Sequence, residues 1–544
     1  MIIPINNIKD KVMWQIIPLI IAFVQWGITN IFEVDRFFFT YDEHTHSYYI
    51  VKFLYFIFLF LLWKYIFFVI LNLKSNIKLQ RWFGIFVFYF FIMLILLLVL
   101  WPGTWCWDDI WVANKYQYYI AYGWHHVITE YLQMVLLQIL PFVGGVVLLQ
   151  NLIISSIVAY IILEVETNFL DGFKYKNPLI DLLIKCFPFL LPPIVLYQMS
   201  GYRMGVYVYF EILLVCMLIC LSRASAAKSY KWIAVVAVLT ALVSNWRNES
   251  IFYVFLTPLL FITAPCAIIS NKKKILGIII VLFSFLLIRN EENSTLQAMG
   301  YGSNYEVTST LLPGVEAIRA ADSSDGKLLE VIGRVLKLDI IYKNPDLNGE
   351  ELYWLDEKVV KAGYSETEYH DYMKAIIELA IKHYDVVVKE RVKNALSMMG
   401  VYGKQGYVST NIIDVAAKLF DEEEIGPNKI FQNENWLFNK PISAYVRKNV
   451  ILLLGFSRSD GTTYRPYFLF WNSLLPSLFM FFTCCCLFVK KAWKEFMVYC
   501  FALVKIPIIC ITAPSTFFFY MLSAYMLGWA SLTLCFLILA SNKK

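Results

Sequence analysis

The sequence predicts an all-α fold, a polytopic transmembrane helical bundle with a mostly helical domain inserted before its last three spans. Hydrophobic residues make up 59% of the 544 residues, and charged residues only 16%. The apolar residues gather in runs of about twenty, the length at which a helix crosses a bilayer. A soluble protein of this size could not bury so much apolar side chain, so most of it must face lipid or other helices.

The basic residues report orientation and not a nucleic-acid partner. The net charge is +6, but the lysines and arginines lie in short loops between the apolar runs. The expected spans are 13–33, 49–72, 82–101, 143–163, 180–197, 203–222, 231–245, 251–268, 275–289, 467–489, 496–513 and 516–540. About twelve spans put every basic cluster on one side, which the positive-inside rule assigns to the cytoplasm. We therefore expect a multi-pass protein of the plasma (cytoplasmic) membrane with both termini in the cytoplasm.

The chain divides into three predicted regions. Residues 1–289 form an N-terminal transmembrane region, residues 290–466 an extracytoplasmic soluble domain, and residues 467–544 the C-terminal spans. The middle region has Gly and Pro punctuation, charge runs and apolar residues at helical spacing, and about 175 residues are enough for a separate core. Within the first region, residues 101–127 form an outer loop. Residues 127–140 are too short for a crossing and fit an interfacial helix.

Two adjacent carboxylates follow the third span. Residues 101–111 read WPGTWCWDDIW, so Asp108 and Asp109 are held at the membrane surface among tryptophans that include Trp107. One interpretation is structural, because aspartates are favoured at helix N-termini. The other is chemical: one carboxylate is a general base for an acceptor hydroxyl, and its neighbour holds a metal or orients the acceptor.

Histidines and arginines fall on the same predicted side of the membrane. His125 and His126 either pack at the interface or donate to a phosphate, and the sequence leaves both interpretations open. Arg203 and Arg247 either anchor their spans at the headgroups or clamp a lipid phosphate as negative charge grows on it. Arginines beside a carboxylate base would suit a donor linked to a lipid phosphate.

The order of three motifs resembles the GT-C superfamily of integral membrane glycosyltransferases. WPGTWCWDDIW, then WHHV, then NWRNES is similar to a bacterial branch with a Tyr-Pro-Gly…Asp loop, a His-His-Pro-like element and a later Arg-Asn pair. The resemblance covers residues 82–270, and ITAPSTFFFYML is similar to the terminal element of that branch. Val127 departs from the pattern, where the branch has proline, and so does Arg203, which stands where the branch has Lys-Asp.

The resemblance implies transfer of a sugar from a polyprenyl-phosphate donor to an extracytoplasmic glycan or lipid-linked acceptor, in cell-envelope polysaccharide biosynthesis. The reaction would be a single displacement with inversion, in which an aspartate acts as general base. By position, the resemblance assigns the general base to Asp108, and it matches the second histidine of the branch to His126 and the Arg-Asn pair to Arg247 and Asn248. From the residues themselves, Asp109 is a second catalytic candidate, and Arg203 and His125 are further candidates for the donor phosphate. Asn248, Glu249 and Trp107 are candidates for orienting the acceptor. If a divalent cation (Mg²⁺ or Mn²⁺) takes part, Asp109 and Glu249 are its candidate ligands.

Two other classes of protein share these features. A transporter, flippase or polymerase of lipid-linked glycans would have the same spans and aromatic belts, but it should line a path with ionisable residues inside the membrane. Few such residues occur here, chiefly Glu130, Glu211 and Lys505. A non-catalytic membrane assembly factor would use its outer domain for binding alone.

Overall fold

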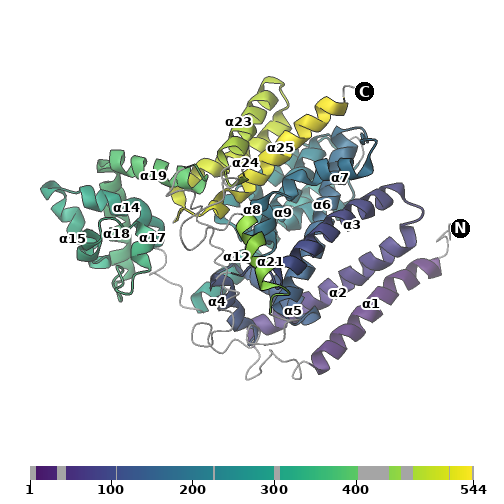
Figure 1. Cartoon of the computed structure of the whole chain (residues 1–544), viewed down its shortest axis with the longest axis horizontal. Helices are drawn as coiled ribbons and strands as arrows, with labels where there is room; N and C mark the ends of the chain where they lie inside the picture. Colours follow the sequence, from purple (N-terminus) through teal and green to yellow (C-terminus); the bar gives the residue numbers. More distant parts are fainter. Residues whose placement is uncertain are drawn as a thin grey trace.

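The computed structural model describes residues 8–32, 45–105, 107–223, 227–298, 307–401, 440–454, 470–513 and 515–541. These residues form helices joined by loops, with isolated bridges at Thr104–Ser200 and Leu336–Val360. The helices make a bundle, and a smaller group of helices stands to one side of it (Figure 1). The expected all-α class is therefore confirmed for the part of the chain that is described.

The first half of the chain forms most of the bundle. Its helices are α1 (Ile8–Ile31), α2 (His46–Asn72), α3 (Ile77–Leu100), α4 (Trp107–Tyr116), α5 (Val127–Ile139), α6 (Val143–Phe169), α7 (Pro178–Cys186), η1 (Phe187–Phe189), α8 (Pro192–Gln198), α9 (Met204–Ser222), α10 (Tyr230–Trp246), η2 (Asn248–Ser250), α11 (Tyr253–Thr263) and α12 (Asn271–Ala298). The bundle is completed by α21 (Ala444–Leu454), α23 (Leu474–Val489), α24 (Trp493–Thr512), η6 (Phe518–Met521) and α25 (Leu522–Ser541).

Each of the twelve expected spans overlaps one to three of these helices in its described residues. Among the described residues, six helices are long and apolar enough to cross a membrane: α2, α3, α6, α9, α24 and the continuous η6–α25. The expected span 180–197 is instead a helix pair bent by 74°, which makes a seventh candidate if it crosses as one unit. Several others are short for a crossing, such as α10 with 17 residues and α11 with 11. A multi-pass membrane protein is supported, while the count of twelve spans stays a prediction.

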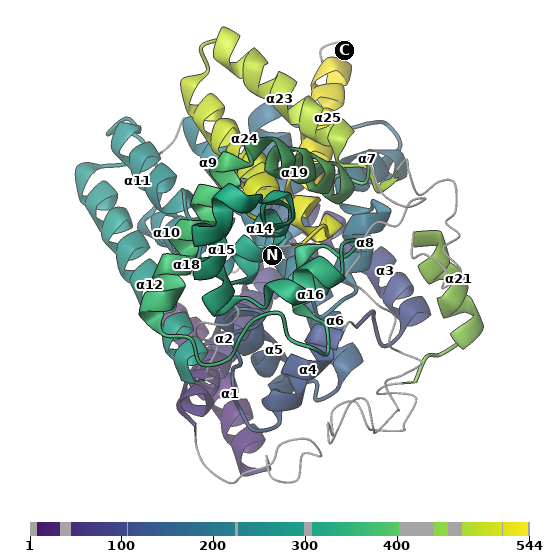
Figure 2. The same ribbon diagram turned by 90° about the vertical axis from the view of Figure 1, so that its left-hand side faces the viewer.

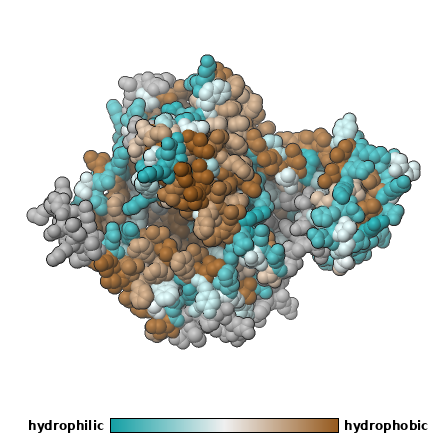
Figure 3. Space-filling view, turned by 180° about the vertical axis from the view of Figure 1, so that it is seen from behind, coloured by the Kyte–Doolittle hydropathy of each residue, from teal (hydrophilic) through white to brown (hydrophobic). Residues whose placement is uncertain are grey.

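A separate lobe follows α12. We call α14 (Thr308–Ala320), α15 (Gly326–Val335), α16 (Leu338–Lys343), α17 (Gly349–Tyr353) and α18 (Glu366–Lys382) the lobe. Its apolar residues, among them Leu311, Ile332 and Tyr372, form a core of their own. The surface of the lobe is largely hydrophilic, whereas hydrophobic residues are widespread on the bundle (Figure 3). This contrast is expected of a lobe in water beside a bundle in lipid.

The described helices of the expected domain 290–466 do not all pack on one another. Helix α12 continues to Ala298, past the expected boundary at residue 289. Helix α19 (Tyr384–Met398) leaves the lobe, and its C-terminal Met398 belongs to the core of the bundle. Helix α21 also packs on the bundle, through Ile451 and Arg447. The rest of this region, residues 402–439 and 455–469, lies outside the described residues.

A tight turn between α3 and α4 places the aspartate pair. The Thr104 backbone N–H donates to the Met199 carbonyl oxygen at 2.8 Å, and Arg447 donates to the carbonyls of Leu100 at 3.1 Å and Gly103 at 2.8 Å. Gly103 has φ +107°, and an added Cβ would lie 2.6 Å from the Met199 oxygen. Only glycine fits this turn without strain, so the start of α4 is fixed against the loop that precedes α9.

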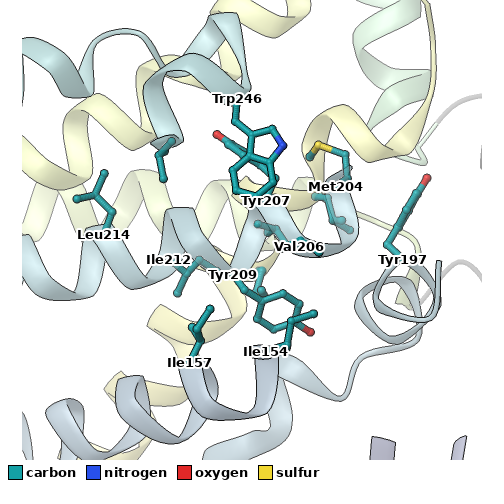
Figure 4. Close-up of a cluster of buried hydrophobic side chains, with 14 of the residues drawn as sticks. Ile154, Ile157, Tyr197, Met204, Val206, Tyr207, Tyr209, Ile212, Leu214 and Trp246 are labelled. Carbon is teal, nitrogen blue, oxygen red and sulfur yellow. The ribbon is translucent and has the colours of Figure 1, made fainter. Parts of the chain in front are cut away.

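A buried ion pair joins α24 to α9 inside the bundle. The Lys505 ammonium lies 2.9 Å from a Glu211 carboxylate oxygen and donates to the Tyr207 hydroxyl at 2.8 Å. Tyr207 packs against Trp246 with their ring centroids 6.1 Å apart (Figure 4). Two of the three ionisable residues expected inside the membrane, Glu211 and Lys505, therefore neutralise each other and join α24 to α9. Through Tyr207, the pair also lies next to Trp246 of α10, the helix that leads into the NWRNES segment.

Replacing Lys505 with methionine is expected to lower the free energy of unfolding by about 3–5 kcal/mol, because Glu211 would remain buried without its partner. Denaturant unfolding in detergent measures the loss. The control is the double variant Lys505→Met/Glu211→Leu, which removes both charges and should recover most of the stability. Equal losses in the two variants would show that the charges themselves are not what matters at this contact.

Candidate functional site

Asp109 is buried at the start of α4, with 1% of its surface exposed. Its Oδ2 accepts a hydrogen bond from the Ser200 hydroxyl at 3.2 Å, and its Oδ1 lies 3.4 Å from Nδ1 of His125. The Ser200 hydroxyl in turn accepts from the Tyr202 backbone N–H at 3.0 Å. Asp109 therefore links α4 to the WHHV segment and to the loop before α9. Its contacts hold these three segments in place.

Asp108 faces a different direction. Successive residues on a helix point about 100° apart, and Asp108 is partly exposed where Asp109 is buried. It lies close enough to Glu350 of α17 to influence the pKa of that carboxyl. Both aspartates occupy the first turn of α4 and not its cap position, so their charge also favours the helix N-terminus. Of the pair, Asp108 is the more exposed carboxylate.

The WHHV segment is held by carboxylates on both sides. Glu130 of α5 accepts hydrogen bonds from the backbone N–H groups of Tyr122, Gly123 at 3.0 Å and His125 at 3.2 Å. His126 caps α5, because its Nδ1 accepts from the backbone N–H of Ile128 at 3.3 Å. Burial, then the nearby cations Arg203 and Arg289, lower the pKa of His126 to about 3. A neutral His126 that caps a helix supports the turn and is a poor partner for a phosphate.

Arg247 is buried in an ion pair with Glu249. Its Nε donates to Oε1 of Glu249 at 2.6 Å, and its guanidinium stacks over the rings of Tyr520 at 5.3 Å and Phe519 at 5.9 Å. Burial alone would raise the pKa of Glu249, but Arg247 and then Lys505 outweigh it and bring that pKa to about 2. The positive charge of Arg247 is therefore already paired with a carboxylate of the protein.

Replacing Glu249 with glutamine is expected to destabilise the protein by about 3–5 kcal/mol, because the Arg247 guanidinium would remain buried without its counter-charge. Thermal unfolding in detergent at neutral pH measures this. Glu330→Gln, which removes an exposed carboxylate of the lobe, is the matched control and should change stability by less than about 1 kcal/mol. A loss no larger than that of the control would contradict the buried pair.

Arg203 differs from Arg247 because it has no carboxylate within ion-pair distance among the described residues. Its Nη1 donates to the Trp124 carbonyl oxygen at 3.5 Å, and its Nε is buried without a hydrogen-bond partner. Its charge lowers the pKa of both His125 and His126, after burial as the larger cause. The guanidinium thus lies near both histidines and keeps a buried N–H donor without a partner.

A chain of contacts joins the aspartate pair to the arginines. The rings of His125, 3.4 Å from Asp109, and Tyr202 have centroids 5.2 Å apart, and those of Tyr202 and Phe519 are also 5.2 Å apart. Phe519 then lies under the Arg247 guanidinium. The sequence-predicted carboxylates, histidines and arginines therefore meet in one region, although they come from four separate segments.

Three further groups belong to this region and were not expected from the sequence. Arg289 of α12 donates to the Asn248 side-chain oxygen at 3.3 Å. This hydrogen bond engages Asn248, a residue that was expected to contact the acceptor. Glu292, one turn further, accepts from the Val127 backbone N–H at 2.9 Å. Glu350 reaches the site from the lobe. Arg289 and Glu292 could have been suspected from the sequence, because charged residues cluster at the end of α12. No local feature of the sequence indicated that Glu350 belongs to the site. The Trp107 side chain lies outside the described residues.

Exposed aromatic rings border the same region. Trp111 and Trp354 are 45% and 58% exposed. Trp124 lies between them, with ring centroids 6.1 Å from Trp111 and 6.4 Å from Trp354. Large exposed rings gathered from α4, the WHHV segment and the end of α17 form an aromatic rim between the bundle and the lobe. The rim was not expected from the sequence, because Trp354 is remote along the chain.

The candidate metal ligands do not come together. Glu249 is occupied by Arg247, and Asp109 faces Ser200 and His125. Across the described ranges, no group of three His, Cys, Asp or Glu side chains has the arrangement of a metal site. These two carboxylates therefore do not fit a divalent cation, and no step is assigned to one.

Glu350 makes the stability of the lobe contact sensitive to pH. Burial, then Glu351 and Asp108, raise its pKa to about 8, against about 4.3 in an unfolded chain. Between these values the folded state holds more protons than the unfolded state, so stability should fall as pH rises from about 4.5 to 8. Glu350→Gln should flatten this dependence, as measured by thermal unfolding across the interval. Glu330→Gln is the control and should keep the pH dependence of the wild type. If Glu350→Gln also kept that dependence, the raised pKa of Glu350 would be contradicted.

Comparisons of this chain with models of known protein families, with curated proteins and with solved structures give no match.

Proposed function

We propose that the protein is a membrane glycosyltransferase of the GT-C type, which moves a sugar from a polyprenyl-phosphate donor to an extracytoplasmic glycan or lipid-linked acceptor. The observation that carries the proposal is Arg203, whose partly buried guanidinium has no carboxylate at ion-pair distance among the described residues. A buried cation without a counter-charge is costly unless an anion binds it. Asp108, partly exposed in the first turn of α4, would supply the base that sugar transfer requires.

The donor phosphate would be held chiefly by Arg203. A guanidinium can donate two parallel hydrogen bonds to a phosphate, and its charge stabilises the phosphate as it departs. Arg289 supports the same role, because its one hydrogen bond in the described structure goes to a neutral amide. Arg247 contributes less charge, since Glu249 already neutralises it. We therefore assign phosphate binding mainly to Arg203, and not to Arg247, which the resemblance had indicated.

The reaction would be a single displacement. Asp108 takes the proton from an acceptor hydroxyl, the hydroxyl oxygen forms a bond to the anomeric carbon, and the bond from that carbon to the phosphate oxygen breaks. The electron pair leaves with the polyprenyl phosphate, and the configuration at the anomeric carbon inverts. Asp109 and Glu130 do not react. They hold His125 and the WHHV segment in place.

The aromatic rim supports a carbohydrate substrate. Sugars present flat C–H faces beside their hydroxyls, and exposed tryptophan rings offer a matching apolar surface with a polar edge. Trp111, Trp124 and Trp354 would contact the acceptor glycan as it enters between the bundle and the lobe. The site would face the outside of the plasma membrane, because the basic loops 74–81 and 174–176 lie at the opposite ends of α3 and α6.

The direct test incubates the purified protein with a radiolabelled polyprenyl-phosphate sugar and membrane glycans extracted from the same cells. Label should move to the glycan fraction, and Arg203→Gln should abolish the transfer while Arg334→Gln, which removes a half-exposed arginine of the lobe, leaves it unchanged. Movement of the intact labelled donor across liposomes, without transfer, would overturn the proposal in favour of a flippase or transporter. Binding of glycan without either activity would favour an assembly factor.

A further inference from the structure

A second arginine with unused donors lies between α19 and the end of α24. Arg391 donates through Nη1 to the carbonyl oxygen of Ala513 at 2.9 Å. Its Nε and Nη2 are buried and have no hydrogen-bond partner. Its neighbour Glu390 lies 3.6 Å from Lys393, and Arg391 has no carboxylate at ion-pair distance within the described ranges. Two donor directions of this guanidinium are left for a ligand.

Asn394 adds a further donor on the same side of the helix. It lies three residues after Arg391, so both side chains project from one face of α19. That face continues through Ala395 and Met398, which pack against the core of the bundle. Asn394 is 4% exposed, and its Nδ2 has no partner. The two side chains therefore present N–H groups to one place, the junction of α19 with α24 and η6.

Leaving these groups unsatisfied is costly. A buried polar group without a hydrogen bond costs about 1–3 kcal/mol, and a charged group costs more. Burial lowers the pKa of Arg391 to about 10, in spite of the adjacent Glu390. The junction is therefore strained electrostatically, and an anion would relieve that strain.

The depth of the junction indicates the kind of anion. Helix α24 is a candidate membrane span that ends at Thr512, and Arg391 binds the carbonyl of the next residue. Ile511, in the last turn of this span, is 66% exposed. An apolar surface that ends beside an arginine is the pattern found where a span leaves the hydrocarbon core and meets the lipid headgroups. The available anion at that depth is a phosphate with an apolar tail.

We propose that Arg391 and Asn394 bind the phosphate of an anionic membrane lipid at the junction of α19 with α24. The bound lipid would fasten α19, and with it the lobe, to the bundle. In Figure 2, α19 lies directly over α24 and α25, in keeping with the contacts between α19, α24 and η6. This lipid site does not depend on sugar transfer and would remain if the protein had another activity.

Binding is measured on the full-length protein in detergent by thermal unfolding and by native mass spectrometry. Phosphatidylglycerol should raise the Tm by at least about 2 °C, whereas zwitterionic phosphatidylcholine should not. Arg391→Gln should keep the Tm of the lipid-free protein, because no ion pair is lost, and should weaken phosphatidylglycerol binding at least about tenfold. Lys393→Gln removes an exposed charge from the same helix and should bind as the wild type does.

Each further outcome bears on the proposal. Asn394→Ala should weaken phosphatidylglycerol binding without loss of fold, which supports a two-residue site. Equal binding by wild type and Arg391→Gln would overturn it, as would equal stabilisation by phosphatidylcholine. Stabilisation by inorganic phosphate alone, lost in Arg391→Gln, would keep the phosphate site and overturn the lipid as its source.

Discussion

Replacing Arg203 with glutamine is expected to reduce sugar transfer by about 100- to 1000-fold, the effect of removing one preorganised donor from a developing oxyanion. The reason is that no carboxylate among the described residues lies at ion-pair distance from Arg203, and its Nε has no hydrogen-bond partner there, so this guanidinium keeps a donor for the phosphate. The loss should appear in kcat/KM for the polyprenyl-phosphate donor, measured by label transfer.

The stability of this variant separates catalysis from folding. Since no ion pair of Arg203 is broken, Arg203→Gln should unfold within about 1 °C of the wild type. Arg203→Lys keeps the charge but loses the two-pronged geometry, and it should fall between glutamine and the wild type. Full activity in Arg203→Gln would remove this residue from the phosphate site and would return that role to Arg289 or Arg247.

Replacing Asp108 with asparagine is expected to abolish transfer, with a loss of about 100- to 10,000-fold in kcat. Asparagine has nearly the same shape and cannot accept the proton of the acceptor hydroxyl. The measurement is transfer at saturating donor across a range of pH, because loss of the base should also remove the acidic limb of the rate profile.

Asp109→Asn serves as the internal comparison. Asp109 is buried on Ser200 and His125, so its replacement should lower stability together with activity. Asp339→Asn, on the exposed surface of the lobe, should change neither. Retained activity in Asp108→Asn, together with loss in Asp109→Asn at unchanged stability, would transfer the role of base to Asp109.

The positions of the helices could be predicted because hydropathy is a local property. An apolar run of about twenty residues must satisfy its backbone hydrogen bonds internally, so it becomes a helix wherever it lies in the bundle. The exception at 180–197 has a local cause. Pro188, Pro192 and Pro193 interrupt the run, and the chain bends by 74° between α7 and α8.

The candidate site could be predicted only in part. Asp108, Asp109, Arg203 and Arg247 stand out because they fall on the predicted outer side, opposite the basic loops. Their division of labour did not follow from the sequence. Although they are adjacent in the chain, Asp109 is buried and Asp108 is partly exposed. Glu249 forms an ion pair with Arg247, whereas no carboxylate among the described residues lies at ion-pair distance from Arg203.

By itself the sequence determined that this is a helical, multi-pass membrane protein with a charged, aromatic cluster around residues 101–127, because composition and run length act along the chain. Only the tertiary structure decided that Glu350 and Trp354 of the lobe, Arg289 of α12 and Tyr520 near the C-terminus meet that cluster. The physical reason is that ion pairing and burial depend on distance in space, which the order of residues does not specify.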